Sequence, residues 1–466
     1  MLAKYLKLAA SAALIGLSAC VNAAVLSESQ QQELQMLKQQ ALKSELSYQL
    51  IESLTTEVGN RLMGTPGDEL AVKWAVAKMN SLGFDKVWTE EVTGTEWIRG
   101  EAEAKILAPY PQKMVAIALG GSVGTEKQGI NAEVVHFENL DALKAAPEGS
   151  LDGKIAFVSY RMERHIDGKG YGPAVGTRVN GASVAAKKGA LALIMRSVGT
   201  DNNRTAHTGV LHYEDGVKKI PAAALSNPDA DMLVNQIRRG QPVKFYLNLS
   251  ASINEQKTIK SANVIGEITG SKYPEQIVAI GAHLDSWDVG TGALDDGLGI
   301  GMVMAAAKHL SDLPTRPEKT VRVILFAAEE VGLLGAKAYM ETHKDNMQQH
   351  TIGAEWDFGI GPIYQIKSGV GENALPAIAE FAQYLAPLGV TLDTENNAKA
   401  QSDMSLLSEA GMPSINFSPD GSHYFDYHHT ENDTLDKVNA KDLKLNTAIY
   451  TMFAYFAAQA NIDFRQ

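Results

Sequence analysis

The stretch IVAIGAHLDSWDVGTGALDDGLG, residues 277–299, indicates the fold of this 466-residue chain. It opens with an apolar, β-branched run of the kind found in buried strands. The run breaks at a glycine, and His283 and Asp285 follow closely. Further on, Asp295 and Asp296 precede a helix-like segment. Open α/β sheets bind ligands beyond the carboxyl ends of strands, beside helix starts, so this stretch predicts an α/β fold with a functional edge here.

Strand-like and helix-like segments alternate from this stretch to the carboxyl terminus. Short apolar runs predict buried strands, and longer amphipathic runs predict helices. Their alternation is typical of an α/β domain. The expected strands are 276–282, 321–328, 351–355 and 414–417, and the expected helices are 299–310, 332–343, 374–388 and 440–459.

The upstream part of the chain changes character at about residue 109. Residues 24–108 contain amphipathic helix-like segments and two strand-like runs, and we assign them to the same domain as residues 255–466. Residues 109–254 carry short β-like runs between Gly- and Asp-rich turns, with one helix-like segment at 181–188. This pattern predicts a separate β-rich module inserted into the larger domain.

The amino terminus, residues 1–23, has the pattern of a secretory signal peptide and predicts export to the periplasm or the extracellular space. Lys4 and Lys7 precede a short apolar segment that ends in small residues. The sequence LSAC at 17–20 resembles a bacterial lipobox, which would lipidate Cys20 and anchor the protein to a membrane. The sequence VNA at 21–23 instead suits ordinary cleavage before Ala24. The sequence does not decide between these two cleavage sites.

Composition and charge exclude one class of partner. The formal net charge of -12 leaves no excess of basic residues to neutralise phosphates, which argues against nucleic acid as a ligand. With 45% hydrophobic and 21% charged residues, the composition is that of an ordinary soluble globular protein. Cys20 is the only cysteine, so the mature protein has neither an internal disulfide nor a thiolate metal ligand.

Histidines and carboxylates gather in four sequence-distant segments, three of which follow strand-like runs. Imidazole and carboxylate ligands together suit zinc, with one position left open for water or substrate. Adjacent glutamates directly after a buried strand are hard to explain by packing alone. Because neighbouring side chains of an extended chain point in opposite directions, one can bind metal while the other faces the substrate. The segments supply His283 with Asp295, Glu329 with Glu330, Glu355 with Asp357, and His428 with His429.

Five motifs in the carboxyl half carry a family resemblance: GAHLDS (281–286), GALDDGLG (292–299), FAAEEVGLLGA (326–336), EWDFG (355–359) and HHTENDT (428–434). They resemble those of the co-catalytic dizinc exopeptidases, which include secreted bacterial leucyl aminopeptidases and aminopeptidase Y, and most of all the carboxypeptidase Q type. The resemblance implies an α/β fold with a mixed central sheet flanked by helices. It also implies that the insert is a protease-associated domain.

The resemblance further implies a role for each matching residue. Asp295 would bridge two zinc ions. His283 and Asp357 would complete one zinc site, and Glu330 and His429 would complete the other. His429 is preferred to its neighbour because the family's ligand directly precedes Ser/Thr-x-x-Asp-Thr.

Around these ligands, the resemblance implies a catalytic set. Glu329 matches the general base, and Asp285 would orient His283 through its second ring nitrogen. Asp296 stands where relatives have a cis peptide bond. The remaining expected neighbours are Ser402 and Asp403 on the substrate side, Tyr424 or Tyr427 as a donor to the oxyanion, and Asp433 behind the ligands, whereas His423 and His428 are expected to be bystanders.

The function implied is that of an exported dizinc exopeptidase. It would hydrolyse dipeptides or remove amino-terminal residues from short peptides, through a metal-bridging hydroxide with Glu329 as general base. The sequence leaves the choice between aminopeptidase and dipeptidase open, as it does zinc against manganese or cobalt. Relatives of the carboxypeptidase Q type dimerise, so a homodimer is a further expectation.

Two other functions are compatible with this fold. A glutaminyl-cyclase-like acyltransferase uses one zinc, and the complete five-ligand set weighs against it. A non-catalytic binding relative of the transferrin-receptor type would lack ligands, and none is missing from the motifs.

Overall fold

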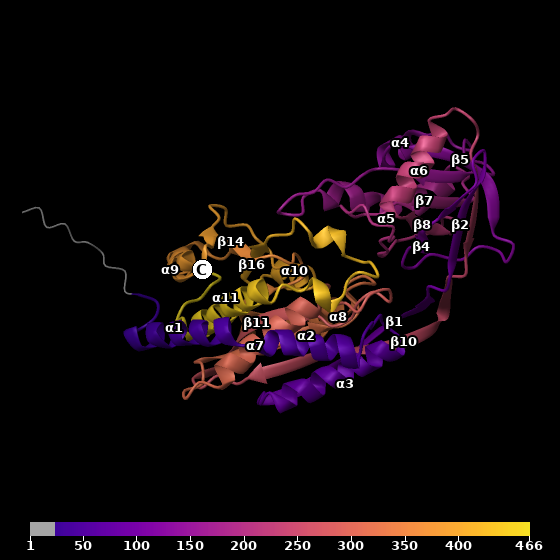
Figure 1. The fold of residues 1–466 in the computed structure, drawn as a ribbon. Helices are drawn as coiled ribbons and strands as arrows, with labels where there is room; N and C mark the ends of the chain where they lie inside the picture. The colour runs from indigo at the N-terminus through magenta and orange to yellow at the C-terminus, as the bar shows by residue number, and fades with distance from the viewer. Residues whose placement is uncertain (1–23) are drawn as a thin grey trace, which may run out of the picture.

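The chain folds into two lobes, each built around a sheet of eight strands (Figure 1). The computed structural model describes residues 24–466, so the expected signal peptide and Cys20 lie outside the described residues. Strand β1 (Lys86–Ile98) leads into the second sheet, and β10 (Ser252–Ile268) returns beside it. The second lobe, called the insert lobe, therefore interrupts the first, called the main lobe. Within residues 24–466, no helix has the length and apolarity needed to cross a membrane.

The main sheet is mixed, with parallel strands at its centre. Strand β11 (Tyr273–His283) lies between β12 (Lys319–Phe326) and β13 (His350–Glu355) and is parallel to both. Residues 277–283 are buried, because a central parallel strand is covered on both faces, which explains the continuous apolar run. The strand order is β1-β10-β12-β11-β13-β16-β14-β15, with β14 at Ile363–Gly369, β15 at Thr391–Leu392 and β16 at Ser414–Pro419.

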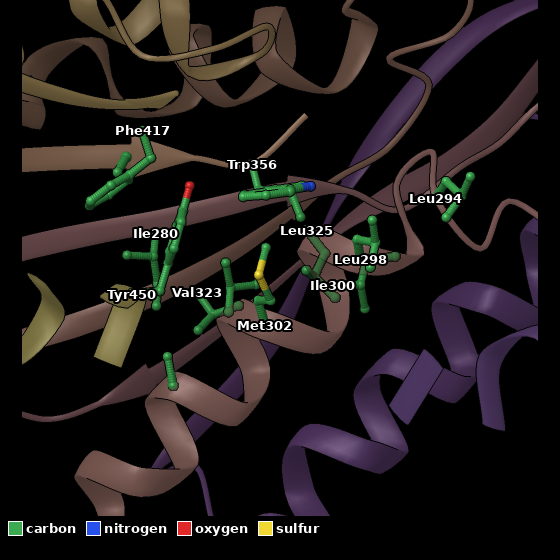
Figure 2. Close-up of a cluster of buried hydrophobic side chains, with 14 of the residues drawn as sticks. Ile280, Leu294, Leu298, Ile300, Met302, Val323, Leu325, Trp356, Phe417 and Tyr450 are labelled. Atoms are coloured by element: carbon green, nitrogen blue, oxygen red, sulfur yellow. The ribbon is translucent and has the colours of Figure 1, made fainter. Parts of the chain in front are cut away.

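Helices cover both faces of the main sheet, which confirms the predicted fold class. Helices α7 and α11 pack on one face with α1 and α2 outside them, whereas α8 and α10 lie on the other face. Figure 2 shows the core on the first face, to which α7 contributes Leu298 and Met302 and the sheet contributes Ile280 and Val323. The helices are α1 (Glu28–Lys43), α2 (Leu46–Glu57), α3 (Pro66–Ser81), α7 (Gly297–Ser311), α8 (Leu334–His343), α9 (Leu375–Leu385), α10 (Met404–Glu409) and α11 (Ala440–Gln459).

The insert lobe has its own sheet, with strand order β3-β2-β9-β5-β6-β7-β8-β4. This sheet spans residues 102–249, where the sequence pattern places the module at 109–254. Its longest helix, α5 (Tyr171–Lys187), begins well before the predicted start at 181, because Gly172, Pro173 and Gly176 mask the helical pattern of its first turns. The other elements are β2 (Ala102–Ala108), β3 (Gln112–Met114), β4 (Ala116–Ala118), β5 (Ile130–Phe137), α4 (Leu140–Ala145), β6 (Ile155–Val158), β7 (Ala192–Arg196), β8 (Ala222–Leu225), α6 (Asn227–Ile237) and β9 (Lys244–Leu249).

A buried polar network lies between the main sheet and α8. The Arg322 guanidinium donates to Glu267 Oε1 at 2.6 Å and to the Tyr339 hydroxyl at 2.7 Å. That hydroxyl is also 2.7 Å from His350 Nε2. Since it already accepts from Arg322, it donates its own proton to an unprotonated Nε2. Burial and the positive charges of Arg322 and His343 lower the pKa of His350 to about 3.

We expect His350 to make folding sensitive to acid. Its pKa is about 3 in the folded state against an ordinary 6.5, so the unfolded state binds the proton more readily and stability falls below about pH 6.5. The loss from this residue is about 2 kcal/mol by about pH 5. The urea midpoint of His350→Gln should therefore fall less steeply over this range than that of the wild type. His423→Gln, at an exposed histidine, should follow the wild type, and an equally steep fall in His350→Gln would contradict the assignment.

Candidate active site

The predicted metal ligands meet at the carboxyl edge of the main sheet. Strands β11, β12 and β13 are parallel, so their carboxyl ends lie at the same edge, and each is followed by one of the predicted polar segments. The loop after β16 adds the fourth segment. The residues brought together are His283, Asp295, Glu330, Asp357 and His429.

Asp295 lies at the centre of this group. Its Oδ1 is 3.0 Å from His283 Nε2, and its Oδ2 is 3.3 Å from His429 Nε2. His283 Nε2 is also 3.2 Å from Asp357 Oδ1, and His429 Nε2 is 3.1 Å from Glu330 Oε2. The two carboxylate oxygens of Asp295 thus face two separate histidine–carboxylate pairs.

The chemistry of this cluster fits metal cations. Asp295 Oδ2 and Glu330 Oε1 are buried and have no hydrogen-bond partner among residues 24–466. Burial and the charge of Asp295 raise the pKa of Glu330 well above its usual range. Buried carboxylate oxygens without partners are costly, and a bound cation would remove this cost. Two groups of side chains have ligand atoms close enough together to hold such ions. They are His283 with Asp295 and Glu330, and Asp295 with His428 and His429.

Glu329 lies beside the cluster and lines the cavity next to it. Its Oε1 accepts a hydrogen bond from the Ser402 hydroxyl at 2.5 Å. Burial and the negative charge of Asp357 raise the pKa of Glu329 to about 8. A carboxyl group that is fixed in position and titrates near neutral pH is suited to proton transfer.

Asp285 supports the site differently from the expectation. The carbonyl oxygen of Asp285, rather than its carboxylate, lies at hydrogen-bond distance from His283 Nδ1, at 3.1 Å. The nearest carboxylate oxygen is 3.7 Å from that nitrogen. The carboxylate instead accepts from the backbone N–H groups of Glu329 at 2.9 Å and Glu330 at 3.3 Å. It therefore fixes the backbone of the two adjacent glutamates, because both N–H groups donate to the same carboxylate.

Asp296 and Asp433 hold the backbone of the central segment. The Asp295–Asp296 peptide bond is cis. The Asp296 carboxylate accepts from the N–H of Gly299 at 2.9 Å, which caps the start of α7. Asp433 accepts from the N–H groups of Leu294 at 2.7 Å and Asp295 at 3.2 Å. Both carboxylates thus act on the backbone around the central aspartate.

The remaining expected residues divide into two groups. Ser402 and Tyr424 line the cavity. Asp403 is fully buried, and neither of its carboxylate oxygens has a hydrogen-bond partner within the described chain. Burial and the charge of Glu329 raise the pKa of Asp403 well above its usual range. Asp403 therefore lies behind the cavity wall.

His428 lies inside the cluster, although the sequence pattern treats it as a bystander. Its Nε2 is 3.6 Å from Asp295 Oδ2. Its ring stacks on that of His429, with centroids 3.5 Å apart and an interplanar angle of 20°. The two consecutive histidines are the sequence feature that could have indicated this, because they bring two imidazoles to the same part of the site. His423, in contrast, is exposed and pairs with Asp426.

Arg61 supports the backbone of the site, and the sequence pattern does not reveal it. Its side chain is fully buried. Nε donates to the carbonyl of Leu284 at 2.6 Å, and Nη1 and Nη2 donate to those of Thr291 at 2.7 Å and Gly292 at 2.9 Å. A Cβ at Gly292, whose φ is +60°, would lie 2.5 Å from Arg61 Nη1, so glycine is required for this approach. Arg61 therefore holds both ends of the loop between the first two predicted ligands.

The insert lobe also contributes to the site. Figure 1 shows α5 on the side of the insert lobe that faces the main lobe. Tyr171 and Arg178 lie two turns apart on this helix and therefore on the same face. Arg178 Nη2 donates to the Tyr171 hydroxyl at 2.7 Å, and its Nη1 is 3.5 Å from His429 Nδ1. No local signal in the sequence marks these residues.

A cavity of about 400 Å³ opens beside the cluster and is shared by the two lobes. One wall carries the carboxylates and histidines described above, and the others are largely apolar and aromatic. Beyond the cluster, its lining includes Leu333, Phe358, Tyr424 and Phe425 from the main lobe, and Tyr171, Arg178 and Val210 from the insert lobe.

Comparison with known proteins agrees with this geometry. Residues 263–454 match the model of peptidase family M28. The chain is 35% identical to mouse carboxypeptidase Q over 412 residues, which cover 88% of this chain and 85% of the mouse protein. The crystal structure of a peptidase M28 precursor from Shewanella amazonensis is 49% identical, with a TM-score of 0.92 over 94% of this chain and 98% of that chain. A zinc aminopeptidase from Bacillus subtilis shares the fold, with a TM-score of 0.64 at 22% identity over 91% of this chain and 98% of that chain. The sequence and the fold of this chain together show that it belongs to peptidase family M28.

Proposed function

We propose that this protein is a dizinc exopeptidase that hydrolyses dipeptides or the amino-terminal bond of short peptides. The observation that carries the proposal is the position of Asp295, whose two carboxylate oxygens face two histidine–carboxylate pairs. One zinc would be held by His283 and Asp357, the other by Glu330 and His429, with Asp295 shared. The likeness to carboxypeptidase Q supports the same assignment.

The residues around the cluster divide the remaining work. When bound, zinc ions polarise a carbonyl group and lower the pKa of a bound water. Glu329 would accept the proton of the attacking water at a carboxylate oxygen and deliver it to the leaving amine. Ser402 would hold Glu329 in position through its 2.5 Å hydrogen bond. Tyr424 lines the same cavity. Its hydroxyl would donate to the carbonyl oxygen as negative charge develops there.

The cavity favours a small substrate. Its volume of about 400 Å³ lies toward the lower end of the range for ligand pockets, roughly 300 to 1,000 Å³. The insert lobe closes one side of it through Tyr171 and Arg178. A folded protein or a long peptide chain would have to displace this lobe, so short peptides fit better.

Metal content and peptide hydrolysis test the proposal together. We expect about two zinc ions per wild-type chain by mass spectrometry, and cleavage within a panel of neutral dipeptides. Asp295→Asn should lose metal and activity together, because it removes the shared ligand charge. Asp312→Asn, at an exposed carboxylate that pairs with Lys308 at the carboxyl end of α7, should retain its metal. One zinc per chain with no peptide cleavage would instead favour a cyclase-like acyltransferase.

A further inference from the structure

We propose that Arg178 of the insert lobe binds the free carboxylate of the peptide substrate. The insert lobe would thereby select peptides whose carboxyl terminus is unblocked. This inference rests on the proposed function, since it assigns a second contact to a substrate in the same cavity.

Arg178 is a buried arginine whose hydrogen-bonding capacity is not used. Four arginines of residues 24–466 are at least nine-tenths buried, with Arg178 itself 5% exposed. Arg196 and Arg322 pair with carboxylates at 2.7 and 2.6 Å, and Arg61 donates to backbone carbonyls. Within the described chain, the guanidinium of Arg178 has hydrogen-bond contacts only with a tyrosine hydroxyl and a histidine ring, and its Nε is buried without an acceptor. A buried guanidinium without a charged partner is costly, so an anionic ligand is the missing element.

The guanidinium is held toward the cavity by aromatic side chains. Arg178 lies over the ring of Tyr171, 5.5 Å from its centroid, and donates to its hydroxyl. Tyr171 in turn stacks on Phe425, with centroids 5.0 Å apart and an interplanar angle of 16°. These contacts fix the side chain before a ligand arrives, which reduces the entropy lost on binding.

The neighbouring histidine does not use the free donors of Arg178. His429 Nδ1 lies 3.3 Å from the carbonyl oxygen of Thr208. If His429 binds metal through Nε2, its Nδ1 carries a proton and donates to that carbonyl. It then cannot accept from Arg178 Nη1, so Nη1 remains available to a ligand.

The charge pattern of the cavity identifies the ligand class. Among the described residues, Arg178 is the only lysine or arginine that lines it. A guanidinium carries a fixed positive charge and donates strong, charge-assisted hydrogen bonds to the oxygens of a carboxylate. A protonated amine would be repelled. Because Arg178 is next to His429, the carboxylate that it binds belongs to a residue close to the bond that is cleaved.

Paired substrates test this assignment. We would compare a neutral dipeptide with its carboxamide, using wild type, Arg178→Met, Arg178→Lys and Arg161→Met. Arg161 is an exposed arginine of the insert lobe, so its variant controls for the loss of charge. Arg178→Met should raise KM for the dipeptide about 10- to 100-fold and leave the carboxamide nearly unchanged, because only the dipeptide loses a charge-assisted hydrogen bond. Arg178→Lys should recover part of the loss, and Arg161→Met should match the wild type.

Binding without turnover provides the second measurement. Calorimetric titration of the dipeptide into Glu329→Gln protein should give a Kd that Arg178→Met weakens by a similar factor. Equal losses on dipeptide and carboxamide, or no loss on either, would overturn the role of Arg178 while leaving the peptidase intact. Failure of the proposed function is distinct, because zinc-loaded wild type would then cleave neither substrate.

Discussion

Glu329→Gln is expected to lower kcat by about 10³-fold while the zinc content stays at the wild-type level. The substitution keeps the shape of the side chain and an oxygen that can accept from Ser402, but it removes the group that takes up a proton. Glu329 is not one of the carboxylates that face His283 or His429, so the metal cluster should be undisturbed. Steady-state kinetics on a dipeptide, together with metal analysis of the same sample, measure both quantities.

A second glutamate provides the control for Glu329. Glu341 lies on α8, is exposed and pairs with Lys344, so Glu341→Gln should keep full activity. Loss of zinc from Glu329→Gln would instead identify Glu329 as a ligand. Retention of more than about a tenth of the activity would contradict its role as the proton acceptor.

Arg61→Met is expected to be the most destabilising substitution at the site, by at least about 3 kcal/mol. It removes a donor from three backbone carbonyls at the two ends of the loop between His283 and Asp295. Of these, only the carbonyl of Gly292 keeps another donor in residues 24–466, the N–H of Gly297. Release of this loop should also weaken zinc binding, because it connects two predicted ligands. The urea midpoint measures the first effect, and the rate of zinc transfer to a chelator measures the second.

Asn60→Ala provides the matched control. Asn60 is next to Arg61 in the chain, and its side chain makes one exposed hydrogen bond, to the carbonyl of Asp288. Its urea midpoint and its rate of zinc transfer should stay close to wild type. A wild-type midpoint in Arg61→Met would show that the loop is held by other contacts.

The sequence predicts the main sheet and the ligand cluster because both follow from local pattern. A buried parallel strand has a continuous apolar run, and the polar residues that end such runs must lie at one edge. His283 and Glu330 are predicted in this way from their own neighbours in the chain. The pairing around Asp295 is implied by the resemblance, and the observed distances agree with it.

The residues that escape prediction act over long separations. Arg61 binds carbonyl groups 223 to 231 positions away, and Arg178 lies 251 positions from His429. Neither stands in a periodic pattern that distinguishes a buried arginine from a solvated one. The resemblance assigns the carboxylate of Asp285 to His283, whereas in the structure it accepts from two backbone N–H groups. Such assignments depend on tertiary structure, which a single sequence does not display.

The pairing of the two ends of the chain sets an order of events during synthesis. Helices α1 and α11 pack together, and the Tyr455 hydroxyl donates to Glu33 at 2.5 Å. The main lobe therefore cannot close before α11 has left the ribosome, because these contacts join residues 422 positions apart. The insert sheet is contiguous, at residues 102–249, and can form earlier. We expect zinc uptake to be the last step of maturation, since His429 joins the earlier ligands only when α11 has packed against α1 and the main lobe is complete.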